Sequence, residues 1–277
     1  MTPSIRPETL PTAEPNVQIT PPAEEPGGAM TFFEHLNELR KRIINSLISV
    51  VIGALIGWIV APHFVNWITK PMLDALKGAH LDQKLVYTHP AGYLNLLITL
   101  SIYLGLVMAS PWILYQIWLF VAPALYKHER SAITGFLFST VFLFLAGIAF
   151  GYFVSLPYVL RFLIGFQGPV VPLISINEYF DLILVILLGL GLVFELPILI
   201  FFLTLFGIVT PKFLLQNFRY AILVIAILAA IVTPTPDATT MLVFMAVMVG
   251  LYLLGVGVSW IVVRRRARRL ATPAEAR

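Results

Sequence analysis

Long stretches without a charged residue alternate along the chain with short segments that gather Lys, Arg, Asp and Glu. A helix that crosses a bilayer needs about 20 predominantly apolar residues, and six of the charge-poor stretches are candidates. We therefore predict an all-α integral membrane protein with six transmembrane helices. The expected spans cover residues 43–61, 93–121, 132–154, 182–206, 219–233 and 239–263.

The fifth expected span is unusually short. Arg219 and Pro234 are separated by the 14 residues from Tyr220 to Thr233. At about 1.5 Å per residue such a helix reaches only about 21 Å, whereas the hydrocarbon core is about 30 Å thick. We expect local bilayer thinning or shielding by neighbouring helices. A re-entrant pair over 219–263 is the alternative, but Val243 to Val263 is long enough to cross by itself.

Basic residues flanking the spans predict the orientation, because cytoplasmic loops carry an excess of Lys and Arg. Twelve such residues lie on the side that holds the amino terminus of the first span, and four lie on the other side. The four are Lys70, Lys77, Lys84 and Arg161. We expect both termini on the cytoplasmic side. The net charge of +4 follows largely from this bias, so it does not indicate nucleic-acid binding.

Composition supports a membrane location and excludes several classes of site. The chain has 277 residues, of which 59% are hydrophobic and 12% charged, while soluble domains carry about 25% charged residues. The absence of Cys excludes disulfides, thiolate metal sites and a cysteine nucleophile. Neither a phosphate-binding Gly-rich motif nor a complete zinc-protease motif is present, so we expect neither an enzyme nor a cofactor.

Three regions are expected along the chain. Residues 1–29 are rich in Pro and Glu and read as a disordered leader without the apolar centre of a signal peptide. Residues 30–263 form the membrane domain, and 264–277 form a basic tail. The outer loops at about 62–92 and 155–181 are long, and we expect ordered caps that contain short helices.

The segment before the first span carries the first candidate site. Thr31 and Glu34 fit a helix-capping box, and one apolar stripe predicts a helix that lies along the inner membrane surface before it turns into the span. Glu38 follows Glu34 by one turn. It either pairs with Arg42 at i+4 on an exposed face or binds a ligand.

Three further acids have both a structural and a functional interpretation. Glu129 lies in the loop between the second and third spans and caps a helix or binds a ligand. Glu195 lies in the fourth span, where a charge is costly; it serves a function or bonds a carbonyl freed by Pro197. Asp237 follows a Pro-rich turn and caps the sixth span or contacts a partner.

Two pairs of glycines have the spacing that allows helices to approach closely in membranes. They are Gly53 with Gly57 and Gly147 with Gly151. We interpret both pairs as packing positions within the bundle.

Four segments together resemble the TatC family, the signal-receptor subunits of the twin-arginine translocase. They cover residues 35–42, 115–130, 194–197 and 233–237, and the overall resemblance extends over about 30–263. Their sequences are HLNELRKR, YQIWLFVAPALYKHER, FELP and TPTPD.

The resemblance implies a concave, glove-like bundle in the bacterial plasma membrane that recognises Arg-Arg signal peptides of folded cargo proteins. It also implies single-span partners of the TatA and TatB type, further TatC copies in the complex, and transport driven by the proton-motive force. The implied signal-peptide site comprises Glu38, Glu129, Arg40 and Phe120. The implied partner-contacting or concave-face residues are Glu195, Tyr152, Pro71, Asp237 and Met241.

The chain departs from the family pattern after the last outer turn. Many members have Gln where this chain has Met241, so the polar contact that this Gln would make to a partner helix is not expected here. The alternative hypothesis for the whole protein is a proton-coupled small-solute transporter with Glu195 as proton carrier.

Overall fold

The computed structural model describes residues 32–121, 133–165, 173–233 and 237–271. Helices form most of this part of the chain, and its extended segments pair at the isolated bridge between Val86 and Ser175. The predicted all-α class is confirmed. In chain order the helices are α1 (Phe32–Gly78), α2 (Gly92–Val121), α3 (Ile133–Phe150), η3 (Gly151–Ser155), α4 (Leu156–Gly165), α5 (Ile176–Val193), α6 (Leu196–Leu205), α7 (Pro211–Gln216), α8 (Phe218–Val232) and α9 (Ala238–Ala271).

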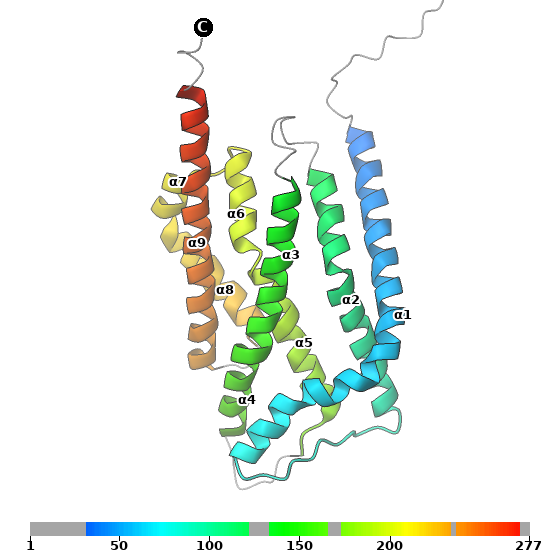
Figure 1. Cartoon of the computed structure of the whole chain (residues 1–277). Helices are drawn as coiled ribbons and strands as arrows, with labels where there is room; N and C mark the ends of the chain where they lie inside the picture. The colour runs from blue at the N-terminus through cyan, green and yellow to red at the C-terminus, as the bar shows by residue number, and fades with distance from the viewer. Residues whose placement is uncertain (1–31, 122–132, 166–172, 234–236, 272–277) are drawn as a thin grey trace, which may run out of the picture.

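Helix α1 corrects the expectation for the beginning of the membrane domain. It is one helix of 47 residues that runs straight from Phe32 and bends only near the opposite end of the bundle (Figure 1). The prediction of a separate surface helix that turns into the first span is therefore wrong. Residues 32–52 contain neither Pro nor Gly to break the helix, whereas Pro62 removes a backbone donor close to the observed bend.

The third and fourth expected spans are longer and less regular than predicted. Helix α3 continues through the π-helical turn η3 into α4, and this continuous helical stretch ends at Gly165. The fourth span is divided into α5 and α6 by a turn at Phe194 and Glu195. Pro197 lies within the first turn of α6, a position that a proline tolerates because no helical donor is lost there.

Five helical segments of the described chain are long and apolar enough to cross a membrane. They establish a multi-pass membrane protein. Helix α8, with 15 residues, is apolar but shorter, as the charge pattern predicts. Six crossings therefore remain a prediction, while the short fifth helix is confirmed.

The beginning of α1 and the end of α9 lie at the same end of the bundle (Figure 1). The opposite end, which we call the far end, is crossed by the second half of α1 (Figure 1). There Val86 donates a backbone hydrogen bond to Ile174 at 3.1 Å and accepts one from Ile176 at 2.9 Å. The described parts of the expected caps are ordered, but their helical parts are continuations of the spanning helices α1 and α3 and not separate short helices. Residues 166–172 of the second expected loop lie outside the described residues.

Helices α1 and α2 approach so closely that their backbones touch. A Cβ atom on Gly53 would lie 2.5 Å from the carbonyl oxygen of Gly105, and one on Gly57 would lie 2.5 Å from that of Ser101. Real Cβ atoms do not approach backbone oxygens this closely. The interpretation of Gly53 and Gly57 as packing positions is confirmed.

The second glycine pair packs α3 and η3 against α5. A Cβ atom on Gly147 would lie 2.6 Å from the carbonyl oxygen of Leu190, and one on Gly151 would lie 2.9 Å from a methyl carbon of Leu187. This pair also serves packing within the bundle, as expected.

Candidate functional site

Glu38 lies on the first turns of α1 and is paired within its own helix. One oxygen, Oε1, accepts a hydrogen bond from Arg42 Nη2 at 3.0 Å. The Glu38 side chain is 15% exposed, and its second oxygen, Oε2, is buried without a hydrogen-bond partner among the described residues. The predicted i+4 pair is thus present, and it leaves one buried carboxylate oxygen without a hydrogen bond to the described residues.

A second helix completes the surroundings of this acid. Arg42 Nη1 donates to Oε1 of Gln116 on α2 at 3.2 Å, and Gln116 is only 2% exposed. Arg42 is therefore held between an acid on α1 and an amide on α2. Because Oε2 of Glu38 is buried, the side chains around it must move before a guanidinium can reach it.

A groove of about 340 Å³ adjoins these residues between α1 and α2, and Arg42, Gln116 and Phe120 contribute to its lining. The remaining lining residues are largely apolar. The ring of Phe120 stacks on that of His35, with centroids 4.4 Å apart and planes inclined by 19°. We call Glu38, Arg42, Gln116, His35 and Phe120 the Glu38 site.

Two expected members of this site are not placed in it by the described residues. Arg40 is exposed and makes no hydrogen bond or ion pair with the described residues. Glu129 lies outside the described residues, so its place beside Glu38 stays a prediction. Sequence reasoning named Phe120 and missed Gln116 and His35 as members, although both stand in the quoted segments 35–42 and 115–130.

Glu195 lies at the turn between α5 and α6, within the membrane-spanning part of the chain. Its side chain is half-buried, its Oε1 atom is buried, and its carboxyl group makes no hydrogen bond to the described residues. The interpretation that this acid bonds a carbonyl freed by Pro197 is therefore wrong. An acid inside the membrane without a hydrogen-bond partner among the described residues is typical of a functional position.

Pro71 and Tyr152 are brought together at the far end. A proline cannot donate to the carbonyl four residues earlier, so Pro71 leaves that of Trp67 without its helical partner. The Tyr152 hydroxyl donates to this carbonyl oxygen at 2.8 Å, and its ring stacks on Trp67 with centroids 3.9 Å apart. The hydroxyl of Tyr179 donates to the next carbonyl, that of Ile68, at 2.7 Å. These bonds give both positions a structural role in fixing the second half of α1.

Asp237 and Met241 occupy the beginning of α9. Oδ2 of Asp237 accepts the backbone N–H of Thr240 at 2.6 Å, so the predicted helix cap is present. Met241 is half-buried and packs against the main hydrophobic core. The five expected partner-facing residues therefore do not form one site, since Glu195, the Pro71–Tyr152 pair and the start of α9 are separate places.

No three His, Asp or Glu side chains within the described ranges gather closely enough to hold a metal ion. The Glu38 site instead offers what cation recognition needs, namely a carboxylate, a buried amide and an aromatic pair beside an apolar groove.

Residues 34–247 match the family model described as Sec-independent protein translocase protein (TatC). The chain belongs to the TatC family. A TatC protein of Koribacter versatilis is 46% identical over 267 residues, which cover 96% of this chain and 98% of the relative. A TatC protein of Carboxydothermus hydrogenoformans is 41% identical and covers 80% of this chain and 90% of its own length.

Solved TatC structures share the fold. A crystal structure of the twin arginine translocase receptor TatC matches with a TM-score of 0.71 and 33% identity, over 82% of this chain and 99% of that one. A second crystal structure of the receptor, in DDM, matches with a TM-score of 0.72 at the same identity and coverage. Family and fold confirm the resemblance and do not favour a small-solute transporter.

Proposed function

We propose that this chain is the signal-receptor subunit of a twin-arginine translocase and binds the consecutive arginines of signal peptides at the Glu38 site. The observation that carries the proposal is the buried Oε2 atom of Glu38, which no described group satisfies. A buried acceptor without a partner costs on the order of 1–3 kcal/mol. A guanidinium from a ligand would remove this cost.

The chemistry of the site favours arginine over lysine. The guanidinium is planar, keeps its proton and presents its donors as a fork that matches a carboxylate, whereas an ammonium is a compact point charge. Glu38 would receive one guanidinium, and Glu129 would receive the other, as the family resemblance implies. The apolar part of the signal would continue along the bundle toward Glu195.

The proposal includes the setting of the subunit. The protein would reside in the bacterial plasma membrane with both termini in the cytoplasm, which the distribution of Lys and Arg favours. It would act with TatA- and TatB-type single-span subunits and further TatC copies, without enzymatic activity of its own. The proton-motive force would supply the work, and a membrane potential provides about 2.3 kcal/mol per charge per 100 mV.

Selectivity between two basic peptides tests this function. Purified full-length protein in detergent should bind a fluorescent Arg-Arg signal peptide at least about tenfold more tightly than the matched Lys-Lys peptide, because both have equal charge but only one has the guanidinium geometry. Fluorescence anisotropy measures both dissociation constants. Equal constants would mean that charge alone attracts the peptides, and the proposed recognition would be wrong.

A substitution at Glu195 tests how this acid is used. Glu195→Gln keeps a polar group of the same size and should leave export of a folded twin-arginine reporter within about twofold, because a polar docking position needs hydrogen bonding and not a titrating proton. Reporter export would be measured in cells whose only TatC protein is the variant. Complete loss of export would instead indicate that Glu195 carries a proton.

A further inference from the structure

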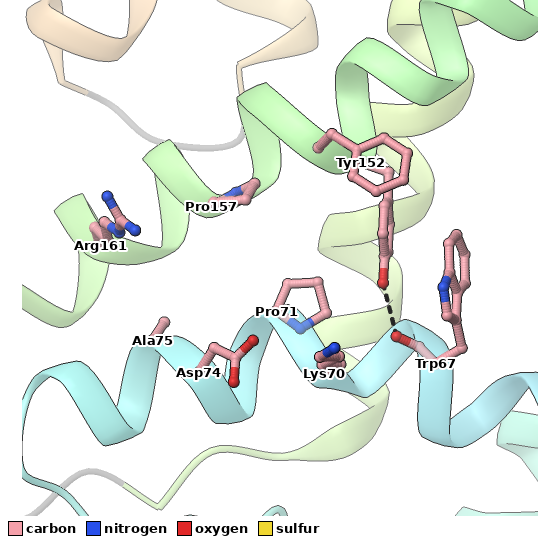
Figure 2. A pocket seen from close by; sticks show the side chains of 9 residues that line it. Trp67, Lys70, Pro71, Asp74, Ala75, Tyr152, Pro157 and Arg161 are labelled. Atoms are coloured by element: carbon pink, nitrogen blue, oxygen red, sulfur yellow. Dashed lines mark hydrogen bonds between the residues drawn. The ribbon is translucent and has the colours of Figure 1, made fainter.

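A pocket of about 330 Å³ lies at the far end, between the second half of α1 and the η3–α4 stretch. Figure 2 shows Lys70, Pro71 and Asp74 on α1 facing Arg161 and Pro157 on α4, with Tyr152 beside Trp67. We call this cavity the outer pocket. It is at the opposite end of the bundle from the Glu38 site (Figure 1), so a ligand in it would not contact the signal-peptide site.

The outer pocket contains two basic residues on the side of the membrane where few are expected. Four basic residues are expected on this side of the membrane, and two of them, Lys70 and Arg161, line the same pocket. Both are exposed, and neither makes a hydrogen bond or ion pair with the described residues. Asp74 also lines the pocket without such a partner, so the three charges leave a net charge of +1.

The wall of the pocket indicates its depth relative to the lipid. Trp67 and Phe153 line it and are 45% and 68% exposed. Arg161 is four residues before the end of its candidate membrane span, and Lys70 lies in the part of α1 beyond the bend near Pro62. Exposed aromatic rings and basic side chains at span ends are typical of the lipid headgroup level. The pocket therefore presents two cations without a partner among the described residues, at a level where we expect phospholipid phosphates.

We propose that the outer pocket binds the phosphate group of an anionic phospholipid, held between Lys70 on α1 and Arg161 on α4. Arg161 would bond phosphate oxygens through its fork of donors, and Lys70 would contribute a point charge. Trp67 and Phe153 would lie along the glycerol and upper acyl region. The lipid would join α1 to α4 beside the Tyr152–Trp67 contact, which holds the second half of α1 in place.

Lipid titration followed by native mass spectrometry tests the proposal. Full-length protein in detergent would be titrated with phosphatidylglycerol, and separately with phosphatidylcholine, for wild type and the double variant K70Q/R161Q. The variant should bind phosphatidylglycerol about tenfold or more weakly, because each basic residue near a lipid surface contributes to attraction. Wild type should prefer phosphatidylglycerol to phosphatidylcholine.

Two further variants test whether a loss of lipid binding comes from the pocket itself and not from overall charge or misfolding. K77Q/K84Q removes two exposed lysines expected on the same side and outside the pocket, and it should change phosphatidylglycerol binding by less than about twofold. D74N removes the pocket acid and should tighten binding by about threefold. A folding defect cannot produce such a gain.

Three results would overturn the proposal. One is equal weakening by K70Q/R161Q and K77Q/K84Q, which would reflect overall charge. Another is displacement of phosphatidylglycerol from wild type by inorganic phosphate, which would indicate a free-anion site. The third is unchanged lipid binding by K70Q/R161Q together with lost cross-linking to a single-span subunit, which would assign the pocket to an acidic partner residue.

Discussion

Glu38→Gln is expected to weaken binding of an Arg-Arg signal peptide by roughly 10- to 100-fold. Hydrogen bonds to charged groups contribute about 1.5–3 kcal/mol, and each 1.4 kcal/mol corresponds to about a tenfold change in affinity. The substitution removes the charge that the peptide guanidinium would meet while keeping the size of the side chain. Fluorescence anisotropy of the labelled peptide with full-length protein in detergent measures the loss.

Glu34→Gln is the matched control for this result. Glu34 is an acid on the same helix one turn earlier, and it is exposed, whereas Glu38 is mostly buried. Because an exposed charge contributes little to binding, we expect Glu34→Gln to change the dissociation constant of the peptide by less than about fivefold. Equal affinities of wild type and Glu38→Gln, or equal losses in the two variants, would contradict a specific role of Glu38.

Gly105→Val is expected to destabilise the folded protein strongly. A Cβ atom at this position would lie 2.6 Å from the Cα atom of Ala54 and from the carbonyl carbon of Gly53 on α1. Both are backbone atoms, so no side chain can move away and the helices must separate. Overpacking of this kind costs on the order of 3 kcal/mol, equivalent to a fall in Tm of roughly 6–12 °C for a chain of this size.

Thermal unfolding in detergent, followed by intrinsic fluorescence, measures this effect. Gly250→Ala on α9 is the control, because a Cβ atom there meets nothing within 4 Å and alanine favours a helix over glycine by up to about 1 kcal/mol. Its Tm should be unchanged or slightly higher. A Tm of Gly105→Val equal to that of wild type would contradict the close approach of α1 and α2.

The membrane helices could be predicted from the sequence because lipid offers backbone groups no hydrogen-bond partners. A spanning segment must therefore be a long apolar helix, and such helices can be recognised in the sequence as stretches without charged residues. The course of α1 was harder to predict. The apolar stripe of its first turns has the same period on a surface helix as on the end of a span, and only the unbroken helix from Phe32 decides between them.

At the Glu38 site, too, contacts within one helix could be predicted from the sequence, whereas contacts between helices could not. Glu38 and Arg42 are four positions apart, and helix geometry alone brings them together. Gln116 is 74 positions from Arg42, and no local rule connects two residues at that separation. The three-dimensional packing of α2 on α1 was needed to find it.

Sequence alone determined where the apolar segments lie, that the fifth is short, and the motifs of the family, because each depends on neighbouring residues or on direct contact with lipid. Because this part of α1 is helical, Pro71 leaves the carbonyl of Trp67 without a helical donor. Tertiary structure decided that Tyr152, 85 positions away, supplies the missing bond, and that Lys70 and Arg161 share one pocket. Such pairings depend on how whole helices pack, and that packing is the sum of many contacts between segments distant in the chain.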